Sequence, residues 1–368
     1  MIQAYNIGAS ITRNQTLPSR SPINYNGVTL HPSDCRVNAT LNGSWRLQIE
    51  HPIDDAGLWR YVEVGTVLLV PSFNGDQLFR IKQRTKSDKG VSADADPIFF
   101  DSANNVFLQN IHVVGKNAQQ ALTQILSGTV YRSFSNIMEL HSAYYIRKNA
   151  MEAINGADNA VMKLWGGEVL YDNYTVRVMQ RVGANRGLVI SRGINLQTGA
   201  LRDKSDITNV VTRIYPTGYK GRLPVSYDYS DSIVIDSYPI IYAKTIAYSE
   251  IAFASDLDPG QDTEGMTVCQ TQQDFDDALW GACQVTFASS SYIDSTLDCR
   301  ISALDALAEQ AGAPVPVISL GDTITLRDTR LDIERQTRVT ELEWNCIENR
   351  AESARLTSQD ELLPDFPS

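Results

Sequence analysis

The chain contains 368 residues, of which 43% are hydrophobic, and at roughly 150 residues per domain this length predicts about two to three buried cores. Acidic residues outnumber basic ones by 43 to 32. The formal charge of −11 therefore argues against a general nucleic-acid binder and against a protein that rests on anionic lipid. Within residues 223–300, thirteen acidic residues are opposed only by Lys244 and Arg300, so this segment alone accounts for the imbalance.

No apolar run approaches the ~20 residues that a transmembrane helix needs, and the N-terminus lacks the charged start and apolar stretch of a signal peptide. Cysteines are few, odd in number and widely spaced: Cys35, Cys269, Cys283, Cys299 and Cys346. A disulfide framework is therefore not expected, and we expect the chain to fold in a reducing cytosol.

The first hundred residues predict β-structure. Residues 45–50 alternate apolar and polar side chains, as a half-buried strand does. Two further strands, residues 65–70 and 78–82, flank the turn sequence Asn74-Gly75-Asp76. Because this turn chemistry is typical of tight β-connections, the two strands are expected to form a hairpin.

Helical spacing of apolar residues begins near Val113. Helices are predicted at residues 116–126, 146–154, 272–282 and 298–311. The last of them carries an apolar stripe formed by Ile301, Leu304, Leu307 and Ala308. Strands are predicted at residues 167–172, 174–180, 188–191, 321–326 and 337–344, and the segment 206–215 leads into a break at residues 216–218.

The two ends of the chain echo one another. Gly65 opens a strand whose partner strand carries Ile81, sixteen residues later, and Gly321 opens a strand whose partner carries Val339, eighteen residues later. The echo suggests a duplicated barrel-like module with mixed α/β material between the copies, although many antiparallel hairpins would match the same pattern.

A search for metal or nucleophilic motifs finds none that is complete. The four histidines, His31, His51, His112 and His141, are scattered, and no His-Glu-x-x-His motif occurs. His31 and Cys35 have the spacing of two zinc ligands, but no second pair follows. Cys283 or Cys299 would need a distant histidine to act as a nucleophile, so inert core cysteines are expected.

Two surface features remain open at this point. The carboxylates of Asp256, Asp258, Asp262 and Glu264 alternate along a turn and could converge on calcium, but their spacing fails the EF-hand pattern. A solvated acidic loop is the favoured reading. The aromatic-rich residues 227–248 could bind a receptor or carbohydrate, or simply form strand core and packing.

Family resemblance extends over most of the chain. Residues 41–52, Leu-Asn-Gly-Ser-Trp-Arg-Leu-Gln-Ile-Glu-His-Pro, resemble an early stretch of siphophage tail-tip hub proteins, which are also called prophage tail or tail-associated lysin proteins. The similarity continues at residues 164–178, 193–196, 206–218 and 321–326. In the central block, Gly166-Gly167 suits a tight hairpin entry, Asp172-Asn173 suits its turn, and Tyr174, Val176 and Val178 form one face.

The resemblance implies an α+β, β-rich fold with two tail-tube-like β-barrel modules and two smaller mixed α/β domains, as in the hub of contractile-phage baseplates. The expected division is an N-terminal barrel at residues 1–110, a mixed domain at 111–205, a second barrel at 206–222 and 315–368, and an acidic mixed domain inserted at 223–314.

The resemblance also implies a place in the virion, at the tail tip, for a protein made in the host cytoplasm. A homotrimer would form a ring of six barrels that closes or extends the distal end of the tail tube and forms the conduit for DNA ejection. DNA would pass without specific binding, helped by repulsion if the acidic segment lines the lumen; facing outward, that segment would be a solubilising rim or a cation site. Expected partners are the distal tail protein, the tape-measure protein and receptor-binding proteins, with no membrane insertion.

Some members of this family carry a peptidoglycan endopeptidase or lysozyme domain after the hub. Here the chain ends at Ser368, soon after the last hub module, which leaves no room for a hydrolase domain of about 100 residues. We therefore expect no enzymatic activity and no catalytic, metal-binding or cofactor-binding residues. The alternative is a tail-associated peptidoglycan hydrolase that acts on the host cell wall.

Overall fold

The computed structural model describes residues 1–5, 27–156, 159–191, 201–261, 263, 266–291, 293–300 and 318–361. The chain forms two compact units. Unit 1 comprises Met1–Leu201 and Asp298–Leu356, and unit 2 comprises Arg202–Leu297 and Thr357–Ser368. Strands make up 46% of the structure and helices 20%, which confirms the expected β-rich α+β class.

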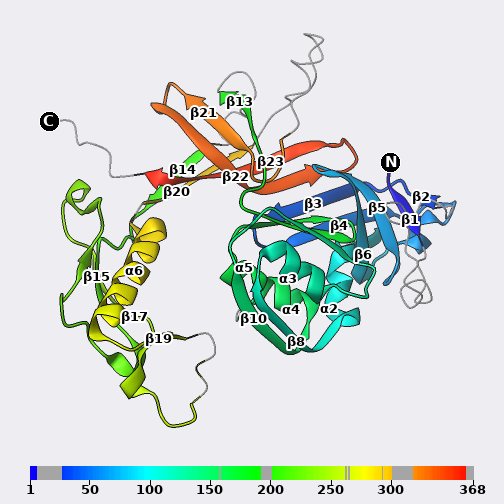
Figure 1. Ribbon diagram of the computed structural model, residues 1–368. Helices are drawn as coiled ribbons and strands as arrows, with labels where there is room; N and C mark the ends of the chain where they lie inside the picture. Colours follow the sequence, from blue (N-terminus) through cyan, green and yellow to red (C-terminus); the bar gives the residue numbers. More distant parts are fainter. Residues whose placement is uncertain are drawn as a thin grey trace. The chain divides into compact units, whose positions relative to one another are not determined.

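One large sheet dominates unit 1 (Figure 1). The strands of this sheet that lie wholly or largely in unit 1 are β1 (Gln3–Tyr5), β2 (Val28–Thr29), β3 (Asp34–Thr40), β4 (Trp45–Pro52), β5 (Val67–Ser72), β6 (Gly75–Lys86), β7 (Gly90–Pro97), β13 (Asn185–Ser191), β21 (Thr323–Asp328), β22 (Ile333–Asn345) and β23 (Arg350–Glu361). They run in the order β23–β22–β3–β4–β7–β6–β5–β1–β2, and β21 and β13 continue from β22. Among the described strands this sheet does not close into a barrel.

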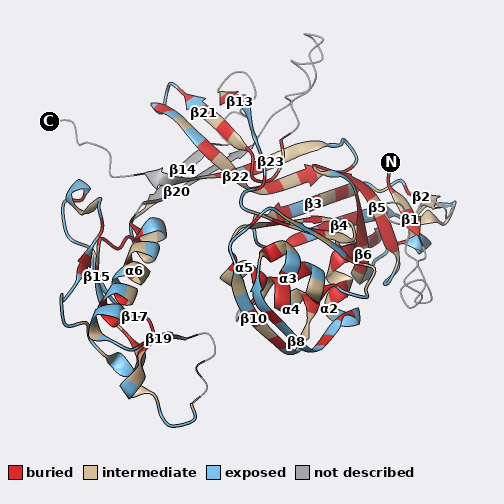
Figure 2. Ribbon diagram, viewed as in Figure 1, coloured by how far each residue is buried: buried red, intermediate tan, exposed pale blue. Residues whose placement is uncertain are grey.

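Alternating burial places the core on one face of this sheet (Figure 2). Strand β4 alternates strictly, with Trp45, Leu47 and Ile49 buried and their neighbours exposed, as its sequence predicts. The expected hairpin is also confirmed, because Ser72 of β5 pairs with Gly75 of β6 across a two-residue turn.

Two hairpins of the large sheet repeat one another in their hydrogen bonds. The Gly65 amide donates to the Ile81 carbonyl (2.9 Å), and the Gly321 amide donates to the Val339 carbonyl (2.8 Å). In both hairpins the partner residue donates back, over 2.9 Å, to the residue that follows the glycine. The echo between the chain ends is therefore a repeated local structure.

The register of the two hairpins is also the same. Six residue pairs run from Val67↔Arg80 to Ser72↔Gly75 in the first hairpin and from Thr323↔Arg338 to Asp328↔Ile333 in the second. The turn of the second hairpin, residues 329–332, is two residues longer than that of the first. This difference accounts for the spacing of sixteen residues in one case and eighteen in the other.

A mixed region completes unit 1. Its strands are β8 (Phe107–Lys116), β9 (Arg132–Ser135), β10 (His141–Asn149), β11 (Glu168–Asp172) and β12 (Thr175–Met179), and its helices are η1 (Leu58–Tyr61), η2 (Ile98–Asp101), α2 (Ser102–Asn105), α3 (Ala118–Ile125), α4 (Ala150–Asn155) and α5 (Val161–Leu164). Helix α3 confirms the prediction at residues 116–126 and begins at a capping box formed by Asn117 and Gln120. The start predicted at residue 146 is wrong, because residues 146–149 pair with β8. A second capping box, formed by Asn149 and Glu152, starts α4 after them.

Unit 2 packs short strands against one long helix. Its elements are β14 (Arg202–Asp206), β15 (Arg213–Thr217), η3 (Tyr219–Gly221), β16 (Ser230–Asp231), η4 (Ile235–Ser237), β17 (Ala243–Ala247), β18 (Ile251–Phe253), η5 (Ala254–Asp256), β19 (Thr267–Cys269) and α6 (Gln272–Ser290); β20 (Ile293–Arg300) follows and runs into unit 1. Helix α6 buries Phe275, Leu279, Cys283 and Phe287, one residue per turn.

Three predictions in this part of the chain need correction or fall outside it. The break predicted at residues 216–218 starts too early, because Pro216 still lies within β15. Proline is tolerated there because β16 pairs only with Arg213 and Ile214, so at Pro216 just one edge of β15 is paired, with β17. Helix α6 runs eight residues beyond the predicted end. Residues 298–300 of the predicted helix 298–311 are strand, and its remainder lies outside the described residues.

The division into four domains stays a prediction. Residues 206–222 lie in unit 2 together with the acidic segment, whereas the described strands after residue 318 belong largely to unit 1. No described helix is both long and apolar enough to cross a membrane.

Candidate assembly interface

Strands β3 and β22 join the two ends of the chain. Residues 36–40 pair antiparallel with residues 341–345, from Arg36↔Asn345 to Thr40↔Glu341. The first repeated hairpin lies on the β3 side of this junction, with β4 and β7 between them, and the second contains β22 itself. The junction therefore makes one continuous sheet out of the two repeated hairpins and their neighbours.

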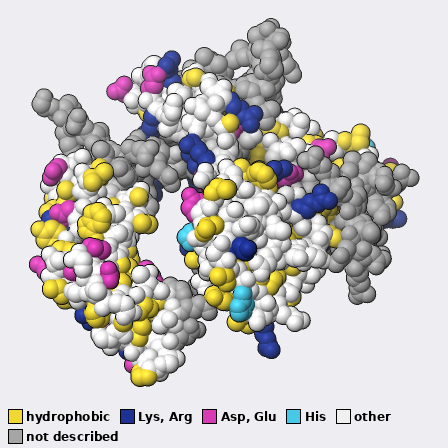
Figure 3. All heavy atoms as spheres, viewed as in Figure 1, with side chains coloured by type: hydrophobic (Ala, Val, Ile, Leu, Met, Phe, Trp, Pro, Cys, Tyr) yellow, Lys and Arg dark blue, Asp and Glu magenta, His cyan; other side chains and the backbone are white. Residues whose placement is uncertain are grey.

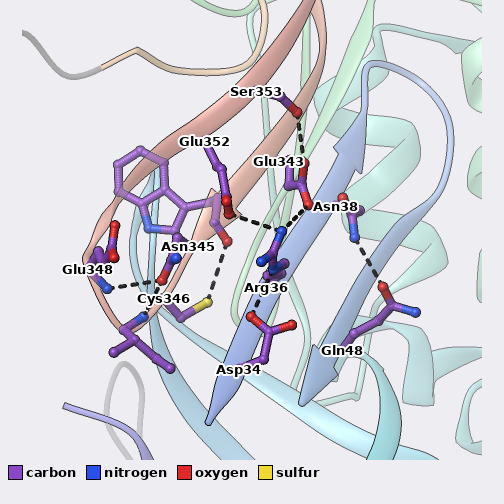
Figure 4. Close-up of polar contacts among 12 residues, drawn as sticks. Asp34, Arg36, Asn38, Gln48, Glu343, Asn345, Cys346, Glu348, Glu352 and Ser353 are labelled. Atoms are coloured by element: carbon purple, nitrogen blue, oxygen red, sulfur yellow. Dashed lines mark hydrogen bonds and ion pairs between the residues drawn. The ribbon is translucent and has the colours of Figure 1, made fainter. Parts of the chain in front are cut away.

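Ion pairs lie across the polar face of this junction (Figure 4). The Arg36 guanidinium contacts Asp34 (2.8 Å), Glu343 (3.0 Å) and Glu352 (3.1 Å), and the Ser353 hydroxyl donates to Glu343 (2.8 Å). Hydrogen bonds to Asp34 and then to Glu343 raise the pKa of Arg36 above its usual value, so it stays charged. Since these side chains are about one-third exposed, each pair adds at most about 1 kcal/mol and mainly specifies register.

Buried cysteines and aromatic rings fill the other face of the junction. The Cys346 amide donates to the Cys35 carbonyl (2.9 Å), and both side chains are buried. Trp344 lies 6.4 Å from Phe73, measured between ring centroids, and Phe73 lies 5.1 Å from Trp45. The hydrogen bond to Cys346 and burial both raise the pKa of the Cys35 thiol, so this cysteine is structural.

Two of the sequence blocks that carry the family resemblance, residues 41–52 and 164–178, contact one another. Asn42, in the turn between β3 and β4, accepts a hydrogen bond from the Val169 amide (2.8 Å) and donates one to the Gly167 carbonyl (3.3 Å). Trp45 packs edge-on against Tyr171 at 5.7 Å. These contacts fasten the mixed region to the large sheet.

The turn of the β11–β12 hairpin is fastened to the first repeated hairpin. The Asn173 side chain accepts from the Leu78 amide (2.9 Å), and the Asn173 amide donates to the Gln77 side chain (2.9 Å). The expected hairpin is confirmed, but its turn lies one residue later than predicted, at Asn173-Tyr174, because Asp172 still pairs with Thr175. Val176 and Val178 are fully buried as predicted, whereas Tyr174 belongs to the turn and not to their strand face.

An arginine occupies the same position in both repeated hairpins. Arg80 donates to the Gly65 carbonyl (2.7 Å) and pairs with Asp101 (2.6 Å). Arg338 donates to the Gly321 carbonyl (3.2 Å) and binds both carboxylate oxygens of Glu168 (2.5 and 2.9 Å). An ion pair therefore links the first hairpin to η2, through Asp101, and another links the second hairpin to β11, through Glu168.

The histidine and cysteine candidates do not form a site. His31 is exposed whereas Cys35 is buried in β3, and Cys283 lies in the apolar core of unit 2. Burial raises the pKa of Cys283, and none of the four histidines belongs to unit 2. Cys299 lies in β20. Among the described residues, no group of three His, Cys, Asp or Glu side chains could hold a metal ion.

Basic side chains from outside the acidic segment neutralise part of it. Lys220 pairs with Asp258 (3.1 Å), Arg222 pairs with Asp256 (3.0 Å), and Arg213 pairs with Asp231 (2.6 Å). Asp262 and Glu264 of the proposed cation loop lie outside the described residues. On the face of unit 2 seen in Figure 3, acidic side chains are scattered among hydrophobic ones.

Tyrosines of the aromatic-rich stretch pack within unit 2. Tyr227 donates to the Asp276 carbonyl (2.8 Å) and Tyr238 to the Ser291 carbonyl (2.7 Å), while Tyr248 is bonded to Thr286 (2.8 Å). The Tyr229 ring lies 3.8 Å from the Arg213 guanidinium. This arrangement favours packing over a receptor or carbohydrate site.

Sequence reasoning missed the polar contacts at the junction and the paired arginines. Arg36 and Glu343 have no local pattern that links them, because they are 307 positions apart. The two arginines could be found from the sequence, because Arg80 directly precedes Ile81 and Arg338 directly precedes Val339. An alignment of the two hairpin sequences places them at the same position.

Comparison with known proteins identifies the fold. No protein-family model matches the sequence, and no curated protein matches it by sequence. The prophage tail protein gp18 from Listeria monocytogenes EGD-e shares the fold with a TM-score of 0.60 at 13% identity, covering 98% of this chain and 95% of that one. The 43 kDa tail protein of prophage MuSo2 from Shewanella oneidensis gives 0.60 at 7% identity over 97% and 98% of the two chains. A tail protein from Neisseria meningitidis MC58 gives 0.56 at 11% identity over 97% and 96%. The chain has the fold of prophage tail proteins over nearly its whole length.

Proposed function

We propose that this protein is a structural subunit of the phage tail tip, a baseplate hub in which three copies form a ring at the distal end of the tail tube. The ring closes or extends the tube and surrounds the path of DNA during ejection. The observation that carries the proposal is the repeated hairpin: two modules with one register, joined edge to edge by β3 and β22, are what a chain needs to contribute two equivalent parts to a ring.

The full-length fold likeness to three prophage tail proteins supports the same proposal. The two barrel modules would be completed by strands of the large sheet, and the mixed region and unit 2 would be the remaining two domains. Unit 2 exposes apolar side chains, among them Ile233, Trp280 and Val285, that are available to other tail proteins. The distal tail protein, the tape-measure protein and receptor-binding proteins are the proposed partners.

The proposed role is non-enzymatic. Cys35, Cys269, Cys283 and Cys346 are buried, and the acidic loop residues Asp256 and Asp258 are engaged by Arg222 and Lys220. Nothing in the described residues favours the peptidoglycan hydrolase over the structural role. The acidic groups of unit 2 would keep passing DNA from adhering if they border its path.

Light scattering coupled to size exclusion tests the ring. The expected particle has three times the mass of the chain, and negative-stain images are expected to show a ring with a central hole. A particle that stays monomeric at every protein concentration contradicts the proposal. Turbidity loss in a suspension of host cell walls would instead favour the hydrolase.

A further inference from the structure

Strand β6 has a stretch of edge that no other strand covers. On one side it pairs with β7 as far as Lys86. On the other side it pairs with β5, but only from Gly75 to Arg80. The last hydrogen bonds on this side join Ile81 to Gly65 and Thr66. In the part of the chain that the structure describes, residues 83–86 have no strand on this side.

The equivalent stretch of the second hairpin is covered. Residues 341–345 of β22 begin two positions after Val339, just as residues 83–86 begin two positions after Ile81. They pair with β3 on the same edge that β21 occupies earlier along β22. Strand β3 therefore covers this edge in the second hairpin, whereas no strand of the described chain covers the equivalent edge of the first hairpin, at residues 83–86.

Both strands change register at this point. A shift interrupts the β6–β7 ladder between Ile81 and Gln83. In β22 the Val339 amide faces β21, yet the next carbonyl, that of Thr340, accepts from the Leu41 amide beyond β3 (2.8 Å). By the alternation of an antiparallel ladder, the Leu342 amide also faces β3, and its equivalent in β6 is Arg84.

Charged side chains often protect a free strand edge, but those of β6 are engaged within the molecule. Arg84 forms an ion pair with Glu63, and the Lys86 ammonium lies 5.0 Å from the Trp59 ring. The backbone of residues 83–86 is therefore left able to form a ladder.

We propose that residues 83–86 pair with an edge strand of a second copy of this chain, and that this strand is β14. β14 spans five residues, the same number as the part of β3 that pairs with β22, and it has a single neighbour, β20, among the described strands. The contact joins two different surfaces, so repeating it around an axis closes a ring. The inference rests on the proposed function and assigns the subunit contact of that ring.

Proline at position 84 tests the pairing. Arg84→Pro removes the amide hydrogen that would face the second copy, whereas the matched control, Arg84→Ala, keeps it and removes the same charge. Light scattering on the full chain is expected to show wild type and Arg84→Ala as trimers, and Arg84→Pro as a folded monomer with an unchanged circular dichroism spectrum. Association of the proline variant is expected to be at least about tenfold weaker.

A crosslinking measurement on otherwise unchanged protein covers the case in which the proline variant misfolds. Gln83→benzoylphenylalanine is prepared with normal and with nitrogen-15 label, the two are mixed, and the photoproducts are mapped by mass spectrometry. Mixed-label crosslinks to residues 202–206 support the inference. A trimeric Arg84→Pro variant, or mixed-label crosslinks that map elsewhere, would falsify the β6–β14 contact but leave the trimeric ring intact. A monomeric wild-type protein would overturn the ring itself.

Discussion

Two glycines in the same backbone conformation should respond very differently to the same substitution. Gly65 has φ of 87° and Gly321 has φ of 83°, a region that costs an L-residue about 1–2 kcal/mol. A Cβ atom at Gly65 would meet nothing within 4 Å, whereas one at Gly321 would lie 2.7 Å from Cγ2 of Val182 and 2.8 Å from its carbonyl oxygen. Gly321→Ala must therefore displace backbone as well as adopt a strained conformation.

The expected free energies follow from these surroundings. Gly65→Ala is expected to lower the free energy of unfolding by about 1 kcal/mol, because loss of unfolded-state freedom offsets part of the strain. Gly321→Ala adds an overpacking cost of about 2 kcal/mol, for a total of about 3 kcal/mol. The displacement would also disturb the hydrogen bond from Arg338 to the Val182 carbonyl (3.1 Å).

Urea unfolding followed by tryptophan fluorescence measures the difference. Four of the five tryptophans, Trp45, Trp59, Trp165 and Trp344, belong to unit 1, so the signal reports mainly on the sheet that contains both glycines. With a slope of roughly 3 kcal/mol per molar urea, the two midpoints should differ by about 0.7 M. All proteins are compared at one concentration, since assembly shifts apparent stability. Equal midpoints, or a larger loss in Gly65→Ala, would refute the reasoning.

Three further predictions concern side chains. Glu168→Gln removes the charge that faces Arg338 at a site where the Glu168 side chain is only 14% exposed. It is expected to lower the free energy of unfolding in urea by about 2 kcal/mol. When it is combined with Arg338→Met, the loss should be clearly less than the sum of the two single losses, and strict additivity would contradict the pairing. Burial alone would raise the pKa of Asp276, but hydrogen bonds from Ser226, Gln272 and Val225 outweigh it and leave the pKa below its usual value. The resulting stabilisation is present above the ordinary carboxyl pKa and is lost as pH falls through the lower folded value, so the gap in melting temperature between wild type and Asp276→Asn should shrink in acid; a gap that is constant with pH would show that this account is wrong. Finally, the raised pKa values of Cys35 and Cys283 predict slow alkylation by iodoacetamide at mildly alkaline pH until urea is added, as followed by peptide mass spectrometry, and rapid labelling of the folded protein would count against buried thiols.

Local patterns in the sequence were enough for elements that depend on their own residues. The strict alternation in β4 predicted its strand, and the turn chemistry that begins at Asn74 predicted the hairpin, whose two turn residues are Phe73 and Asn74. The start of α3 follows from its Asn117 capping box. In each case the deciding interactions join residues a few positions apart. Elements of this kind are readable without tertiary information.

Predictions failed where a distant partner decided the outcome. Ile146 lies at helical spacing from Ala150 and Ala153, but pairing with β8 makes residues 146–149 strand. Helix α6 continues through Val285 and Thr286, which favour strands, because Cys283 and Phe287 extend its buried stripe. Arg36 and Glu343 meet only because β3 and β22 pair, and a short sequence window contains no trace of such a pairing.

The longer turn of the second hairpin bears on how the assembly can match its neighbours in symmetry. In the proposed ring, three copies would contribute six hairpins of one register, so the strand framework would repeat sixfold. The longer turn, residues 329–332, would occur only in every second hairpin, so features at the hairpin tips would repeat threefold. One polypeptide built in this way can meet a sixfold tube through its backbone and a threefold partner through its turns.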